Sequence, residues 1–213
     1  MKISRKQLKK LILELTVRQS GPLKLRVLDF DDTIAHTGER VRLYTPDGHR
    51  MLSSDEYAVY VPNPDEYYDE SSFDEFSQVD SEKASPVGPV FEILGNFVRA
   101  QEGARIILIL TARKQIVEQD VRRFLRNNSL DDTNIDFVGV GSSDPIAKVN
   151  IINNYIQNYD IGFVSFFDDS LKNVTAVKEY LDSERISNDV AHIKTIEGTT
   201  RLIRKFKQEE NYG

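Results

Sequence analysis

The feature that most constrains the fold of this chain is a regular alternation of short apolar runs with segments of helical periodicity. After Pro89, apolar residues at helical spacing continue to Gly103, and a mainly apolar run follows at 105–110. The pattern recurs, with predicted strands at 137–140, 163–167 and 190–193, predicted helices through Val117, Val149 and Val174, and a last predicted helix through Leu202, Ile203 and Phe206. This alternation predicts a doubly wound, Rossmann-like α/β fold with a mainly parallel sheet covered on both faces.

The length of 213 residues is enough for one well-buried core and short for two, so we expect one domain at 22–213. Its first strand is predicted at 25–30, ahead of a small cap or insertion at 37–86 that we expect to lie over one edge of the sheet. Within it, Pro46-Asp47-Gly48 predicts a hairpin, and the stretch 62–80 is acidic without a clear period. Residues 1–21 predict a separate amphipathic basic helix, which can dock on the domain or recruit a protein partner.

Composition excludes several classes of function. The chain has no cysteine, so any metal must be bound by oxygen or imidazole. No apolar run approaches the ~18 residues of a membrane span, and no secretory signal is present, so we expect a cytoplasmic protein without a membrane partner. The net charge of −6 makes a polyanion a less favoured partner. Ile12-Leu13-Glu14 resembles the cleavage signal of tailed-phage head proteases, which leaves open a phage-encoded protein that is host-cytoplasmic or virion-associated.

Polar side chains follow the predicted strands. In open α/β sheets, ligands bind beyond the carboxyl ends of the strands, so polar residues at those ends are candidates for chemistry. The polar residues at these positions, or early in the helix after Pro145, are Asp29, Asp31, Thr111, Lys148, Asp168 and Asp169. We expect these side chains to meet in one pocket.

Each of these residues also has a simpler interpretation. An acidic cluster such as 29–32 is typical of a solvated turn, Thr111 can cap the helix that follows, and Lys148 taken alone is typical of a surface lysine. Asp168 and Asp169 can begin a helix, because acids favour helix N-termini. The order of the four signals and their strand contexts favour chemistry over these interpretations.

The four signals resemble the motifs of the haloacid dehalogenase superfamily of phosphohydrolases. Those motifs are Asp-x-Asp-x-Thr, a strand-end Ser or Thr, a Lys and a strand-end acidic pair, and all match here in the family's order. The resemblance covers roughly 25–181 and does not explain the insertion. It implies that Asp29 is the nucleophile and Asp31 the general acid and base, and that Thr111 and Lys148 bind the transferred phosphoryl group.

The resemblance also implies a magnesium site formed by Asp29, Asp169 and the backbone carbonyl of Asp31. The acidic pair departs from the family's pattern, which often has a second acid four residues after the metal-binding Asp, where this chain has Asn173. Asp168 therefore either shares metal binding or lies behind the ligands, and the sequence leaves both alternatives open.

Other polar residues carry weaker signals. Arg113 can contact a substrate or pair with an acid, and the two alternatives are equally favoured. The histidines show no spacing typical of a metal site or a catalytic triad, so we interpret them as structural or surface residues: His36, His49 and His192.

The chemistry of these residue types favours a magnesium-dependent phosphomonoesterase or phosphotransferase with an aspartyl-phosphate intermediate. A phosphate ester repels a carboxylate nucleophile, so Mg²⁺ and Lys148 would have to supply positive charge. The expected partner is a phosphorylated substrate, either a small molecule, including a nucleotide, or a nucleic-acid end. A phosphoacceptor receiver domain is a rival, but its acidic pair precedes the phosphorylated Asp. A second rival is a catalytically silent binding module recruited through the N-terminal helix.

Overall fold

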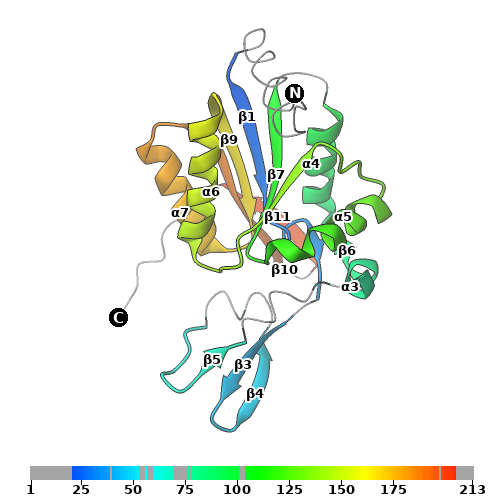
Figure 1. Cartoon of the computed structure of the whole chain (residues 1–213), viewed down its shortest axis with the longest axis vertical. Helices are drawn as coiled ribbons and strands as arrows, with labels where there is room; N and C mark the ends of the chain where they lie inside the picture. The colour runs from blue at the N-terminus through cyan, green and yellow to red at the C-terminus, as the bar shows by residue number, and fades with distance from the viewer. Residues whose placement is uncertain are drawn as a thin grey trace, which may run out of the picture.

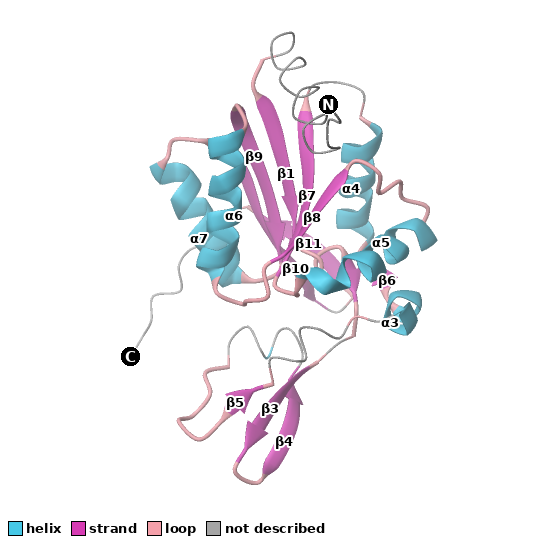
Figure 2. Ribbon diagram, in the orientation of Figure 1, coloured by secondary structure: helices cyan, strands magenta, loops and turns pink. Residues whose placement is uncertain are grey.

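The computed structural model describes residues 21–38, 40–52, 56, 60–69, 76, 78–100, 104–196 and 198–204. Its main body is a six-stranded sheet in the order β11-β10-β9-β1-β7-β8, parallel except for the β10–β11 pair. The strands are β1 (Leu23–Leu28), β7 (Arg105–Thr111), β8 (Ile135–Gly139), β9 (Ile161–Asp168), β10 (Ser187–Ile196) and β11 (Thr199–Ile203). The mainly parallel α/β architecture predicted from the sequence is confirmed (Figure 1 and Figure 2).

Helices cover both faces of this sheet, with α4 and α5 on one face and α6 and α7 on the other (Figure 1). Their bounds are α4 (Gly88–Arg99), α5 (Glu118–Asn127), α6 (Pro145–Asn158) and α7 (Leu171–Ser183). Successive residues of β7 enter different cores: Ile109 belongs to the core that contains Phe124 of α5, and Leu108 to the core that contains Ile152 of α6. Burial on both faces explains why the central strands are continuous apolar runs in the sequence.

The last helix predicted from Leu202, Ile203 and Phe206 is wrong for the part that the structure describes. Leu202 and Ile203 belong to β11, which pairs antiparallel with β10 at the edge of the sheet. The turn between the two strands contains Gly198 at a φ of +73°, a left-handed conformation that glycine adopts without strain. Phe206 lies outside the described residues. A hairpin therefore ends the described part of the chain.

The insertion is built from small antiparallel sheets. Its base is closed where β2 (Ala35–His36) pairs with β6 (Ser85–Pro86). Beyond that base, β3 (Val41–Thr45) lies between β4 (Gly48–Leu52) and β5 (Tyr67–Tyr68), and α3 (Gln78–Lys83) precedes β6.

The hairpin around Pro46-Asp47-Gly48 is confirmed as β3–β4. The location expected for the insertion, over one edge of the main sheet, is wrong: the three-stranded sheet projects from the end of the domain where β1, β7 and β9 terminate (Figure 1). This places it beyond the carboxyl ends of the strands, where ligands of such sheets bind.

The amphipathic basic helix was predicted for residues 1–21, and all of these except Gly21 lie outside the described part of the chain. Within the described residues, no helix combines the length and the apolar character that crossing a membrane requires.

Candidate active site

The predicted site residues converge where the parallel strands end. Leu28 at the end of β1 pairs with Ile109 of β7 on one side and with Phe167 of β9 on the other. Asp29 therefore follows β1 directly between the ends of its two neighbours, and its backbone N–H donates to the Phe167 carbonyl at 2.9 Å. The helices connected to β7 and β9 cover opposite faces of the sheet, so this is a topological switch point, where α/β folds bind their ligands.

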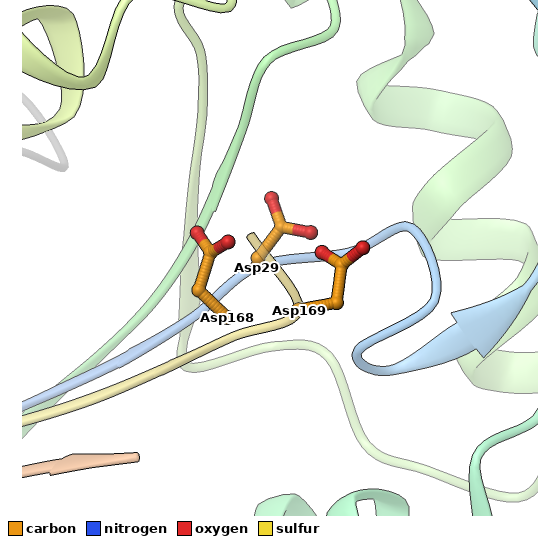
Figure 3. A group of neighbouring side chains, drawn as sticks. All are labelled: Asp29, Asp168 and Asp169. Carbon is orange, nitrogen blue, oxygen red and sulfur yellow. The ribbon is translucent and has the colours of Figure 1, made fainter. Parts of the chain in front are cut away.

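Three carboxylates meet at this point. Asp29, Asp168 and Asp169 each place a carboxylate oxygen within 4.8 Å of the other two, and the three side chains point toward a common space (Figure 3). Burial raises the pKa of Asp29 to about 7, against the Lys148 ammonium that lowers it. Burial, together with the Asp29 and Asp168 carboxylates, also raises the pKa of Asp169 well above its usual range. The site therefore holds more negative charge than its own cations offset.

Lys148 is the cation of this cluster. Its ammonium donates to Asp29 Oδ1 at 2.6 Å and to Asp168 Oδ2 at 2.7 Å, and its side chain is only 2% exposed. Burial opposes its charge, but the two carboxylates raise the pKa of Lys148 overall, so it is an ammonium at neutral pH. It lies in the first turn of α6, which begins at Pro145. Asp144 caps this helix, because its side chain accepts a hydrogen bond from the Ile146 N–H. The interpretation of Lys148 as a surface lysine is wrong.

Asp168 is fully buried, and both of its carboxylate oxygens have donors. Oδ1 accepts from the Ser170 N–H at 2.8 Å and from the Asn173 amide at 3.0 Å. Oδ2 accepts from Lys148 at 2.7 Å and from the same amide at 3.1 Å. Asp169, which is only partly buried, accepts on Oδ1 from Thr33 at 3.4 Å. Asp169 is therefore more available than Asp168 to a ligand.

Asp31 lies beside the three-carboxylate cluster rather than in it. Arg113 binds it with a two-pronged ion pair, Nη2 to Oδ1 at 2.7 Å and Nε to Oδ2 at 2.8 Å. The Thr37 hydroxyl donates to Oδ1 at 2.9 Å. Burial acts to raise the pKa of Asp31, but Arg113 holds it below its usual range. Arg113 was expected either to contact a substrate or to pair with an acid, and in the structure it pairs with Asp31.

Thr111 is the last residue of β7, and its side chain is fully buried. Its hydroxyl accepts from the Arg113 N–H at 3.2 Å. The next helical turn, η2 (Gln115–Val117), begins after Lys114 and has no side-chain cap. The interpretation of Thr111 as a helix cap is therefore wrong. Its hydroxyl lies at the end of β7, beside the end of β1 that Asp29 follows.

Several polar contacts of the site were not found by sequence reasoning. The His192 ring, for which the sequence favours a structural or surface role, has that structural role here, with Nε2 at 2.8 Å from the carbonyl oxygen of Asp169. Asn173, which was noted only as a departure, donates to Asp168. Thr37 and Thr33 donate to Asp31 and Asp169. Two of these residues carry a signal in the sequence: Thr33 is the threonine of the Asp-x-Asp-x-Thr motif, and Asn173 departs from the acidic pattern. The contacts of His192 and Thr37 depend on the fold.

This chain shows only limited similarity to known proteins. No family model matches the sequence, and no curated protein matches it. Among solved structures, the chain is similar to the HAD domain of the effector protein Lem4 from Legionella pneumophila, with a TM-score of 0.48 and 13% identity over 80% of this chain and 85% of that one. For an inactive mutant of the same domain, the TM-score is 0.49 and the sequence identity 13%, over 83% of this chain and 88% of that one. Likeness at this level assigns no family and no activity.

Proposed function

We propose that this protein is a magnesium-dependent phosphohydrolase that uses Asp29 as its nucleophile. The observation that carries the proposal is the Lys148 ammonium held between Asp29 and Asp168, with Asp169 completing a carboxylate cluster at the carboxyl end of the sheet. A carboxylate can attack a phosphate ester only where positive charge offsets the repulsion, and this site combines a fixed ammonium with a site suited to a cation.

The donor set fits magnesium. When all three carboxylates are ionised, they and the one ammonium leave two negative charges uncompensated, which one divalent cation would neutralise in place of protons. Mg²⁺ prefers oxygen ligands, usually one or two carboxylates with several waters. Asp29 and Asp169 would hold it, with the carbonyl of Asp31, while Asp168 would mainly orient Lys148. When bound, Mg²⁺ would offset charge on the phosphoryl group and orient it.

The reaction would proceed in two displacements at phosphorus. A carboxylate oxygen of Asp29 forms a bond to phosphorus while the ester P–O bond breaks, and Asp31 delivers a proton to the departing alkoxide. Because Arg113 favours the ionised form of Asp31, Asp31 must first take that proton from solvent. Asp31 then takes a proton from water, whose oxygen attacks phosphorus and releases phosphate and the Asp29 carboxylate. Lys148 and the Thr111 hydroxyl would bind the non-bridging oxygens throughout. The side chain of Asp29 is 7% exposed and that of Asp31 23%, so the substrate would approach from the Asp31 side.

The substrate class proposed is a phosphate monoester on a nucleotide or at the end of a polynucleotide, with other small phosphorylated molecules as competitors. A small insertion in place of a large lid domain leaves room for an extended substrate. The net charge of −6 acts against a long polyanion, which favours contact with only its terminal nucleotides.

The test is hydrolysis of p-nitrophenyl phosphate, nucleotides and terminally phosphorylated oligonucleotides, with and without Mg²⁺. We expect turnover that requires Mg²⁺ and that falls by about 10³-fold or more in Asp29→Asn, because loss of a covalent nucleophile removes the chemical route. Asp131→Asn, in an exposed loop, is the matched control. Folded wild-type protein that hydrolyses none of these substrates would contradict the proposal and favour the silent binding module.

A further inference from the structure

The Asp31 carboxylate is held in one orientation by three donors. Arg113 contacts both of its oxygens, and Thr37 contacts one of them. A two-pronged arginine pair fixes the plane of a carboxylate, which a single ammonium donor does not. The Asp31 side chain is 23% exposed, whereas that of Arg113 is 6% exposed, so the carboxylate is more accessible to a substrate than the guanidinium is.

The guanidinium of Arg113 also contacts the insertion. Phe76, which is 2% exposed, places its ring under Arg113, with the guanidinium carbon 5.1 Å from the ring centroid. The same ring contacts Phe30, the residue between Asp29 and Asp31, edge to face at 5.2 Å. Phe76 therefore joins the insertion to the loop that carries the acidic pair.

The backbone of Arg113 is held by the end of β8 and the two residues after it. The carbonyl of Arg113 accepts from the Gly141 N–H at 3.0 Å, and the carbonyl of Thr111 accepts from the Val140 N–H at 3.0 Å. Gly139 lies so close to this loop that a Cβ there would be 2.7 Å from the Arg113 oxygen. Both the backbone of Arg113 and the guanidinium at the end of its side chain are thus constrained.

We propose that Arg113 is a positioning residue, clamped between Phe76 and Asp31, that aims the Asp31 carboxylate at the leaving-group oxygen of the substrate. This rests on the proposed function, in which Asp31 is the general acid. In this proposal Arg113 acts through Asp31, because its Nε and Nη2 donors contact that carboxylate and its guanidinium lies over the Phe76 ring. The insertion therefore contributes to proton transfer through Phe76.

The readout is how strongly the reaction depends on the leaving group. p-Nitrophenolate departs as a stable anion and needs little protonation, whereas the alkoxide of an alkyl phosphate needs the proton from Asp31. The value of kcat/KM includes only steps up to the first release of alcohol, so it is insensitive to hydrolysis of the aspartyl phosphate. Comparing kcat/KM for p-nitrophenyl phosphate and for β-glycerophosphate isolates the positioning of the general acid.

Arg113→Lys keeps the charge and removes the two-pronged contact. We expect kcat/KM to fall about 10²-fold for β-glycerophosphate and less than about threefold for p-nitrophenyl phosphate, since general acid catalysis contributes about 10²–10⁴-fold. Phe76→Leu keeps an apolar side chain under an intact Arg113, and the same selective loss at a smaller size, about three- to tenfold, is expected for it. Thermal unfolding checks that each variant is folded.

Arg122→Lys is the matched control, because Arg122 pairs with Glu118 and Asp132 on α5 and its outer loop, away from the site. It should leave the ratio of the two kcat/KM values unchanged. Equal losses on both substrates in Arg113→Lys, or a tenfold weaker inhibition by inorganic phosphate, would overturn the proposal and leave the proposed function standing. Absence of any Asp29-dependent turnover in the wild-type protein would overturn both.

Discussion

The side-chain amide of Asn173 donates hydrogen bonds to both carboxylate oxygens of Asp168, at 3.0 and 3.1 Å. Asn173 lies in the first turn of α7, at the position where the motif pattern often has a second acid. An amide at this position stabilises the charge of Asp168, whereas a carboxylate would repel it. The departure in sequence thus reduces the negative charge that a bound cation must offset.

This relationship predicts that Asn173→Asp destabilises the metal-free protein. Two buried carboxylates would face each other, and the donor to Asp168 would be lost, at a cost of about 1–3 kcal/mol in the free energy of unfolding. Added Mg²⁺ should recover part of that loss, because a cation in the carboxylate cluster offsets the extra charge. Urea unfolding with and without Mg²⁺ measures both effects. The control is Asn154→Asp on the exposed face of α6, and equal losses in the two variants would contradict the prediction.

Proton release should accompany cation binding. The pKa of Asp29 is raised to about 7, chiefly by burial, and that of Asp169 is raised as well, so below neutral pH a cation must displace protons from these carboxyls. We expect Mg²⁺ affinity to rise with pH, by up to about tenfold per unit for each proton displaced, and the part due to Asp29 to level off above about pH 7. Calorimetric titration in buffers of different ionisation enthalpy measures the protons released; an affinity that does not change with pH would contradict this prediction.

The same raised pKa values give the sign of the pH dependence of stability. A carboxyl whose pKa is higher in the folded state binds its proton more tightly when folded. The metal-free protein therefore loses stability as pH rises from the unfolded pKa of about 4 through the folded pKa of about 7. With saturating Mg²⁺ this loss should be reduced or reversed, which urea unfolding at several pH values would show.

Lys148→Met should destabilise the protein more than a typical surface substitution. It leaves Asp29 and Asp168 buried without their shared cation, and removal of one partner from a buried ion pair costs about 3–5 kcal/mol. Adding Asp168→Asn removes one of the stranded charges, so the double variant should be more stable than Lys148→Met alone. A double-mutant cycle in urea unfolding measures this coupling. Additive losses would contradict the shared role of the ammonium.

The positions of the site residues could be predicted because they follow long apolar runs. Asp29 directly follows β1 and Asp168 is the last residue of β9, and both strands are buried on both faces, so the sequence marks the strand end and the polar residue there. Their neighbours in space follow from parallel pairing, which brings all carboxyl ends to one side of the sheet. The expected fold and the convergence of Asp29, Lys148 and the acidic pair rest on this.

The contacts that orient these residues could not be predicted in the same way. Arg113 and Asp31 are 82 residues apart in the sequence, and their pairing depends on how the loop after β7 turns. The final hairpin differs from the predicted helix because Leu202, Ile203 and Phe206 fit helical spacing, while the turn depends on a single glycine, Gly198, in a left-handed conformation. Local periodicity gave no information about which edge strand was available for pairing.

The close approach between β8 and the loop after β7 predicts that Gly139→Ala disturbs both stability and catalysis. A Cβ at Gly139 would lie 2.5 Å from the Lys114 carbonyl carbon and 2.7 Å from the Arg113 oxygen, so the backbone of the loop must shift. Overpacking of this kind costs about 1–3 kcal/mol in the free energy of unfolding, and the shift should carry the Arg113 guanidinium off Asp31. We therefore expect lower thermal stability together with slower hydrolysis of alkyl phosphates.

Gly88→Ala is the matched control for this substitution. Gly88 is the first residue of α4, and a Cβ there would meet nothing within 4 Å. Alanine also loses less conformational entropy than glycine on folding, so stability should stay level or rise by up to about 1 kcal/mol, with hydrolysis unchanged. Because the two variants make the same chemical change, a selective effect of Gly139→Ala on alkyl phosphates would trace the loss to the loop that carries Arg113. Unchanged hydrolysis in a destabilised Gly139→Ala would separate that loop from catalysis.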